Sequence, residues 1–455
     1  MCPPTLAQFS QLVQEQIGKG KQNELTTITP APRDGELPLS YSQQRMWIFE
    51  SLASESASFH VPLGVKLKGK LNTAALEQTF SEIIRRHESL RTVFPAVDDG
   101  PVQTIQAPKR CVLPVVDLSL LPAADREQQA RTLAQSETLR RFDLSKGPLL
   151  RLILLRMGQE DHIVICTMHH IISDGQSFEV VIAEMSQIYS AFSEGQPSPL
   201  AELNIQYVDY VAWQRRWLQG DELESRLAYW RNQLQGAPSR LSLPRRWTAP
   251  RVRSFRGARQ DLSFSLEVLE GLRELSRREG VTLLMTMLSA FVVMLKYYTG
   301  EEDIVVGSSY ANRDQPEAQK LIGILVNSMP LRVDLSGEIT FKDVLSRVRA
   351  VCLDAYTYQI PPEVLSRNNL FNVWFQLERE EREKLEMNGL GYEWYLVHKE
   401  ETKFEMSALM TEQKDGIRGV IEYDAELFEE ETIAEMRQSY VGILEQALAD
   451  PDRRL

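Results

Sequence analysis

The stretch MHHIISDGQSF, residues 168–178, decides how the first half of the chain is interpreted. Two β-rich runs precede it, at 149–157 and 162–168, and the turn-like GQED between them indicates a hairpin. After it, apolar residues recur at helical spacing from Phe178 to Phe192. The stretch is therefore a strand-to-turn-to-helix junction, a place where proteins commonly present functional side chains.

Strand and helix patterns alternate outward from this junction. A half-buried strand is expected at 63–67, followed by Asn72, which is expected to cap a helix with one apolar face. The second half repeats this pattern with further helices and strands, predicted at 282–295, 303–308, 328–333 and 432–448. This order predicts a mixed α/β (α+β) fold, divided into two lobes of roughly 200 residues each.

The composition is that of a soluble globular protein. Of the 455 residues, 43% are hydrophobic and 25% are charged, which provides ample material for a large core. The formal net charge of −12 repels a phosphate backbone and disfavours nucleic acid as a partner. The most apolar run, at 281–295, is shorter than the ~20 residues that cross a bilayer, so no membrane partner is expected.

The four cysteines show no CxxC spacing, so neither a disulfide framework nor a zinc cluster is indicated. The N-terminus lacks the basic region followed by an apolar run that marks a signal peptide. Both observations favour a reducing, cytoplasmic location.

The chain is expected to divide into a short helix, a linker and a large body. Residues 1–17 have helical spacing, and 18–36 are polar and rich in proline without periodicity. The body from residue 37 shows no further low-complexity break. We expect lobes at 37–205 and 206–455.

The junction carries a candidate constellation for acid–base chemistry. His169 and His170 are adjacent at the end of a strand, so their rings point to opposite faces and cannot converge on one metal ion. One imidazole could act as a general base, because its ordinary pKa lies near neutral pH. Asp174 could orient a ring, or pair with an arginine to hold the turn, which we favour. Gly175 is expected to adopt a φ that other residues avoid.

Six motifs in order resemble those of a condensation domain of a nonribosomal peptide synthetase. They are LSYSQQRMW (39–47), RRHESLRTVF (85–94), MHHIISDG (168–175), YVDYVAWQ (207–214), ANRDQPEAQKLIGILVNSMPLR (311–332) and SRNNLF (366–371). The wording SFHVPLGVKLKGKLNTAAL also resembles the subtype that joins two L-residues.

The resemblance implies two lobes, each similar to chloramphenicol acetyltransferase, that form a V-shaped pseudodimer with the HHxxxDG loop at its floor. A tunnel would admit phosphopantetheine arms of an upstream donor and a downstream acceptor carrier protein. The α-amine of the acceptor would attack the aminoacyl or peptidyl thioester of the donor and form an amide. No intrinsic cofactor is implied, because 4′-phosphopantetheine arrives on the carriers, and an adenylation domain is an expected neighbour.

The resemblance also assigns roles to single residues. By motif position, His170 is the catalytic histidine, as a general base or as a positioning group, and His169 is structural. The possible partners of Asp174 are four arginines, namely Arg86, Arg91, Arg313 and Arg367, and for Arg86 and Arg91 a contact with a loop is the alternative. Asn327 is interpreted either as a core amide or as a substrate contact.

Some features depart from the family pattern or extend it. Gln176 stands where the family commonly has Trp, and the region 356–366 is shortened near the expected edge of the channel. The helix at 1–17 resembles the last helix of a preceding carrier protein. The run 231–259 contains eight arginines and no acidic residue, which favours a partner-facing or lobe-bridging segment.

Three other functions remain open. An epimerisation domain would use a histidine and a further carboxylate to invert a Cα. A recruiting domain would dock carriers or partners without chemistry. A free-standing acyltransferase would use coenzyme A in place of a carrier.

Overall fold

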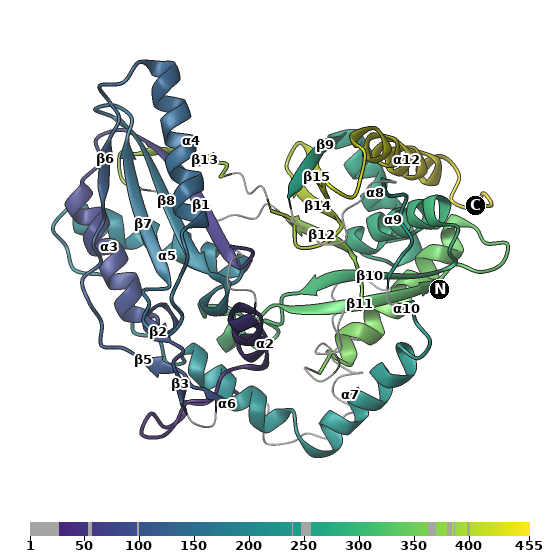
Figure 1. Cartoon of the computed structure of the whole chain (residues 1–455), viewed down its shortest axis with the longest axis horizontal. Coiled ribbons are helices and arrows are strands. Elements are labelled where there is room, and N and C mark those ends of the chain that lie inside the picture. The colour runs from purple at the N-terminus through teal and green to yellow at the C-terminus, as the bar shows by residue number, and fades with distance from the viewer. Residues whose placement is uncertain are drawn as a thin grey trace.

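The computed structural model describes residues 27–52, 57–97, 100–238, 240–246, 256–361, 364, 370–379, 385, 387–397 and 401–455. The expected helix at 1–17 and the first part of the linker lie outside these residues. Figure 1 shows two lobes that each combine a sheet with helices and that together form a V. The expected mixed α/β fold with two lobes is confirmed.

The first lobe is built on a five-stranded sheet with the order β13-β1-β8-β7-β6. Its strands are β1 (His60–Lys68), β6 (Val115–Asp117), β7 (Leu150–Arg156), β8 (Asp161–His169) and β13 (Gly391–Tyr395). Its helices are α3 (Thr73–Arg86), α4 (Ala123–Leu139) and α5 (Gly175–Ser193). Short elements complete it: η1 (Glu88–Arg91), β2 (Thr92–Val93), β3 (Ala96–Val97), β4 (Gly100–Pro101), β5 (Thr104–Ile105) and η2 (His170–Ile172).

Alternation along β8 explains why helices cover both faces of this sheet. Val164 and Cys166 belong to the larger core, which also contains residues of α3 and α5. Ile163 and Ile165 belong to a smaller core with residues of α4. Because successive strand residues point to opposite faces, one strand contributes to two cores. The predicted hairpin is confirmed as the antiparallel pair β7–β8, and Asn72 caps α3 by accepting the Ala75 N–H at 3.0 Å.

The second lobe is built on a six-stranded sheet with the order β11-β10-β12-β14-β15-β9. Its strands are β9 (Gly257–Ser265), β10 (Asp303–Tyr310), β11 (Asn327–Asp334), β12 (Val373–Arg379), β14 (Met406–Gln413) and β15 (Gly416–Asp424). Its helical elements are α8 (Leu266–Glu279), α9 (Leu283–Thr299), η3 (Pro316–Ala318), α10 (Phe341–Thr357) and α12 (Glu430–Ala449). The predicted strands and helices of this half are confirmed, and α9 is buried continuously from Met285 to Leu295.

Several segments connect the lobes. Helix α2 (Tyr41–Leu52) lies between them in Figure 1, and α6 (Tyr207–Trp217) and α7 (Gly220–Gln233) run from the first lobe to the second. Although α6 follows the predicted boundary at 205/206, it packs into the core of the first lobe. Strand β13 also crosses back from the second half and pairs with β1. The lobe boundary at 205/206 therefore stays a prediction. Helix α6 and strand β13 follow that boundary in the sequence but pack with the first lobe.

No single described helix is long and apolar enough to cross a membrane. Helices α8 and α9 pass that test only as a pair bent by 98°.

The arginine-rich run 231–259 forms ion pairs with carboxylates of its own lobe. Arg240 and Arg245 pair with Glu405, at 2.5 and 2.6 Å, and Arg246 pairs with Glu429, at 3.0 Å. Much of its charge is thus compensated inside the molecule.

Candidate active site at the junction of the lobes

The HHxxxDG loop connects β8 to α5 through one short turn. Strand β8 ends at His169, η2 covers His170–Ile172, and α5 begins at Gly175 with Asp174 as its N-cap. The Asp174 carboxylate accepts the Ser177 N–H at 2.9 Å, and the Ser177 hydroxyl accepts the Asp174 N–H at 3.1 Å. This reciprocal capping box satisfies backbone donors of the first turn and fixes where the helix begins.

Asp174 also fastens the second lobe to this loop. Its Oδ1 accepts a hydrogen bond from the Arg313 guanidinium at 2.8 Å, and both side chains are 3% exposed. Its Oδ2 accepts the backbone N–H groups of Leu325 and Val326, at 3.1 and 3.3 Å. The favoured interpretation, in which the carboxylate pairs with an arginine and holds the turn, therefore fits the geometry.

Of the three candidate arginines that the structure describes, Arg313 is the one that pairs with Asp174. Arg86 instead makes a buried bidentate pair with Glu184, with N···O distances of 3.2 and 3.1 Å. Arg91 donates to the backbone carbonyl of Gln106 at 2.6 Å. For these two the ion pair with Asp174 is not formed, and the alternative, a contact with a loop, is found: Arg91 contacts Gln106, and Arg86 also donates to the Ala201 carbonyl at 2.8 Å. Arg367 lies outside the described residues.

Gly175 does not have the expected positive φ, so that prediction is wrong. The chain turns in η2 (His170–Ile172), and Ser173 and Asp174 then follow in extended conformation, with φ of −155° and −131°, so no left-handed residue stands between the strand and α5. A Cβ built on Gly175 would lie 3.9 Å from Oε1 of Glu378 on β12, an ordinary contact, so a small side chain would fit here. Gly175 and Glu378 are both exposed where the two lobes approach each other.

The polar groups of the His169 ring are both hydrogen-bonded. Its Nδ1 accepts the backbone N–H of Ile171 at 3.0 Å, so in a neutral ring the proton is on Nε2 and is donated to Glu50 at 3.2 Å. The ring also packs edge-on against those of His60 and Phe142. These contacts support the structural role that the resemblance implies. In the described ranges, no group of three or more His, Cys, Asp or Glu side chains could hold a metal ion.

His170 is bound differently. Its Nδ1 lies 2.6 Å from the backbone carbonyl oxygen of Ser173, which can only accept, so Nδ1 carries the proton and Nε2 of the neutral ring has a lone pair. Burial, and then the positive charge of Lys403, lower the pKa of His170 to about 4; the Ser173 carbonyl and Asp174 oppose this shift. The ring is therefore neutral at pH 7 and has an accepting nitrogen, as a general base requires.

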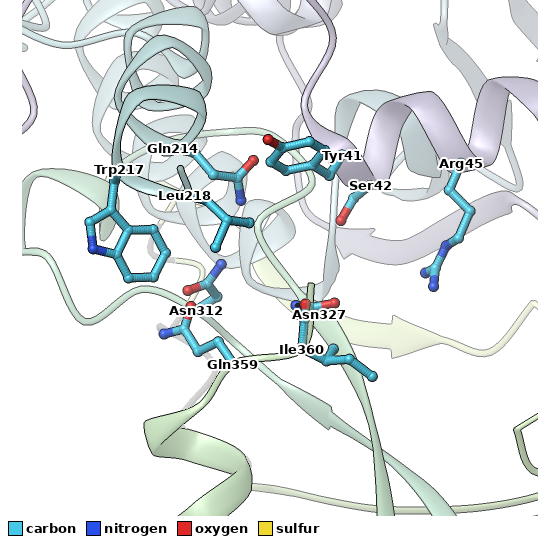
Figure 2. A pocket seen from close by; sticks show the side chains of 10 residues that line it. All are labelled: Tyr41, Ser42, Arg45, Gln214, Trp217, Leu218, Asn312, Asn327, Gln359 and Ile360. Atoms are coloured by element: carbon cyan, nitrogen blue, oxygen red, sulfur yellow. Dashed lines mark hydrogen bonds between the residues drawn. The ribbon is translucent and has the colours of Figure 1, made fainter. Parts of the chain in front are cut away.

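A pocket opens where α2 and α6 of the first lobe meet the second lobe (Figure 2). Its lining residues are Tyr41, Ser42, Arg45, Gln214, Trp217, Leu218, Asn312, Asn327, Gln359 and Ile360. Asn327 donates to the Ile360 carbonyl at 3.2 Å and accepts the Ser328 N–H at 3.0 Å, so it is a satisfied amide that also lines the pocket.

Two other amides in this pocket meet at the buried Tyr210 hydroxyl. Asn312 donates to that oxygen at 2.8 Å and Gln214 at 3.1 Å. Asn312 has φ of +55°, a left-handed conformation that Asn tolerates better than most side chains. Oε1 of Gln214 is buried and has no hydrogen-bond partner among the described residues. The pocket is therefore lined by side-chain amides, and the Oε1 of Gln214 is enclosed by protein.

Sequence reasoning missed several residues of this region. Arg45 and Gln214 lie inside quoted motifs but were given no role, and Glu50 follows the first motif by three residues. Glu378 and Lys403 carried no signal, because only the packing of the second lobe brings them to the loop. The shortened region 356–366 contributes Gln359 and Ile360 to the pocket wall, and part of it lies outside the described residues.

The comparisons with known proteins agree with this architecture. The family model described as "Condensation domain" matches residues 33–455. The chain is 39% identical to malpinin synthetase of Mortierella alpina over 462 residues, and 39% identical to a linear gramicidin synthase of Brevibacillus parabrevis over 447 residues. These alignments cover 99% and 95% of the chain but only 6% of each relative, so the chain spans a small part of the curated relatives that it matches.

Among solved structures, the X-domain from teicoplanin biosynthesis is similar in fold, with a TM-score of 0.85 and 26% sequence identity. The superposition covers 94% of this chain and 98% of the X-domain, which has also been solved in complex with OxyB. The lobes thus have the chloramphenicol-acetyltransferase-like fold of this family. From the family model, the relatives and the fold together, the chain belongs to the condensation-domain family of nonribosomal peptide synthetases.

Proposed function

We propose that this domain forms a peptide bond between two carrier-bound substrates. The donor is an upstream aminoacyl or peptidyl thioester, and the nucleophile is the α-amine of a downstream aminoacyl thioester. The observation that carries the proposal is the state of His170, whose Nδ1 is fixed by the Ser173 carbonyl and whose Nε2 can accept a proton. His170 is the catalytic residue, and Asp174 and Arg313 hold its loop in place.

The reaction requires positioning and the transfer of one proton. The amine nitrogen attacks the thioester carbonyl carbon, a C–N bond forms, and the C–S bond breaks. The proton lost by the amine passes to Nε2 of His170 and then to the departing thiolate, so the products are an amide and a free pantetheine thiol. A thioester is already activated, so holding both arms in attack geometry supplies much of the acceleration, and a general base adds about 10²–10⁴-fold.

The pocket of Figure 2 is suited to part of a carrier arm. Pantetheine contains two amide groups, and the amides of Asn312, Asn327 and Gln214 can pair with them. We place the cofactor on the carriers and none on this chain, with an adenylation domain as neighbour and the subtype that joins two L-residues.

The remaining assignments of the chain are part of the same proposal. Residues 1–17 belong to a preceding carrier, 18–36 are its linker, and the catalytic body divides at 205/206. The three described cysteines, Cys111, Cys166 and Cys352, are buried free thiols, which supports a cytoplasmic site of action.

The decisive experiment loads donor and acceptor carriers with defined aminoacyl arms and follows the acceptor by intact-protein mass spectrometry. The expected product with the wild-type domain is a dipeptidyl acceptor, and little of it with His170→Ala. Absence of dipeptide with the wild type, or an equal rate with His170→Ala, would refute catalysis by this residue. Hydrolysis and chiral analysis of the donor distinguish epimerisation, which would invert the donor without transfer.

A second candidate function is recruitment of a partner enzyme without chemistry. It is favoured by one observation, the complex that the similar X-domain forms with OxyB. In the carrier assay, a recruiting domain would bind both carriers, as measured by titration calorimetry, and yield no dipeptide at any enzyme concentration. Dipeptide formation that depends on His170 would reject this alternative.

A further inference from the structure

A cation from the second lobe lies beside the loop that carries His170. Lys403 belongs to the segment that returns from β13 to β14, and its Nζ is 5.1 Å from the centre of the Phe59 ring. The Phe59 backbone carbonyl accepts the N–H of His170 at 2.8 Å. Two residues earlier, Glu401 accepts a hydrogen bond from Ser58 at 3.3 Å. Two cross-lobe contacts therefore hold this segment against the residues that contact the histidine loop.

The positive charge here is not compensated by an ion pair. Within the described ranges, no carboxylate lies at ion-pair distance from Lys403 or from Arg45 of α2. Lys403 is exposed at the surface. Desolvation of its ammonium by the neighbouring protein, and then the charge of Arg45, lower its pKa to about 8, against the opposing charge of Glu422. Burial also lowers the pKa of Arg45. Two cations thus share one small region.

We propose that Lys403 is a positioning residue for condensation: its ammonium sets the charge environment of His170 and keeps the imidazole in the neutral form that accepts a proton. This inference rests on the proposed function and deepens it. The same positive charge disfavours an incoming α-ammonium relative to the neutral amine, which is the nucleophile. It also favours the negative charge that develops on the thioester oxygen during attack.

The other charged groups around His170 leave Lys403 as the cation that acts on it. Asp174 on the same loop is paired with Arg313, and Glu50 of α2 accepts from His169. On β12, Glu378 lies near Gly175 and accepts a hydrogen bond from Gln376 at 2.6 Å. Of these carboxylates, Asp174 is ion-paired, whereas the hydrogen bonds at Glu50 and Glu378 leave their charges in place. The Lys403 ammonium rests on an aromatic ring, which also leaves its charge intact, and it is the neighbouring cation that lowers the pKa of His170.

The direct test is an NMR titration of the whole domain with labelled histidine, and His170→Asn assigns the signal. Between about pH 8 and about pH 5, the wild-type His170 signal should remain at its neutral position. In Lys403→Met, the signal should begin to shift within this range, because one of the two causes that lower the pKa is gone. Lys403→Arg should restore the wild-type behaviour, and Lys414→Met, at an exposed lysine of the β14–β15 turn, should match the wild type.

An unchanged His170 titration in a folded Lys403→Met domain would overturn the inference. Thermal denaturation shows whether Lys403→Met is folded. If Lys403→Met does not fold, Lys403→Arg provides the test, because it retains the positive charge. A His170 titration that differs between Lys403→Arg and the wild type would also contradict a charge effect. In the carrier assay, the acid limb of the dipeptide rate should move to higher pH with Lys403→Met; an unmoved limb would also overturn the inference. Failure of the proposed function would look different: the wild type itself would form no dipeptide, whatever the titration shows.

Discussion

Asp174 and His170 lie four residues apart on one loop, yet their surroundings are opposite. The Asp174 carboxylate is buried, and both its oxygens accept from groups of the second lobe. The His170 ring is partly exposed, and only its Nδ1 is hydrogen-bonded to a described residue. A buried charge must be fully compensated, whereas a proton acceptor must keep one nitrogen available. The motif therefore has a structural end and a chemical end.

The largest expected effect tests the structural end. Asp174→Asn leaves the Arg313 charge buried without its partner, so the free energy of unfolding should fall by about 3–5 kcal/mol in urea denaturation. The matched control is Asp117→Asn, because Asp117 pairs with Arg156 at 3.1 Å on the surface, where such pairs contribute about 0–1 kcal/mol. Equal losses for the two variants would mean that Asp174 is no more structural than a surface carboxylate.

The next effect tests the chemical end. His170→Asn keeps a donor near the Nδ1 position for the Ser173 carbonyl and removes Nε2. The dipeptide rate should fall by about 10²–10⁴-fold, whereas the free energy of unfolding should change by no more than about 1 kcal/mol. A variant that loses as much stability as Asp174→Asn would erase the distinction between the two ends.

A smaller effect is expected at His169, which we assign to the structural end. Glu50→Gln retains an acceptor for the Nε2–H of His169, so stability should change little. Glu50→Leu removes the acceptor and should cost about 1–3 kcal/mol, measured by thermal denaturation. The dipeptide rate per folded molecule should be similar in both variants. A rate loss with Glu50→Gln would place His169 with the chemistry instead.

The last effect is confined to acidic pH and concerns the pH dependence of stability. The pKa of His170 is about 4 in the folded protein, below its ordinary value of 6.5. As the pH falls from 6.5 towards 4, the unfolded chain binds a proton here that the folded protein does not, so the free energy of unfolding decreases. The wild type minus His170→Asn difference in urea denaturation should decrease over this range and be constant above it. A difference independent of pH would contradict the lowered pKa.

The sequence predicted local features well and distant pairings poorly. Periodicity revealed the β7–β8 hairpin and α5, because each depends on residues close in the chain. The partner of Asp174 could not be chosen, since Arg313 is reached only when the lobes pack. The positive φ expected for Gly175 was wrong because the chain turns earlier, in η2, and the extended residues Ser173 and Asp174 lead directly into α5.

In the candidate site too, the sequence predicted which residues belong to the motif but not the contacts that depend on packing. Motif wording located His170 and Asp174, but the tautomer of His170 depends on where the Ser173 carbonyl points. For Asn327 the sequence left two interpretations open, a core amide or a substrate contact. In the structure its amide is hydrogen-bonded to the Ile360 carbonyl and it also lines the pocket. Lys403 gave no signal, because it lies in the loop before β14 and only the packing of the other lobe brings it to the histidine loop.

Strand β13 has a consequence for the order in which the protein folds. It pairs along β1 in a register that joins Lys68 to Gly391, so the first sheet includes a strand made late in synthesis. On the ribosome, β1 would emerge with one edge unpaired and keep it until β13 follows, at about 5–20 residues per second. Unpaired edges invite pairing with other chains, and contacts so distant in sequence slow folding. Chaperones that shield the nascent first lobe would have most to protect during that interval.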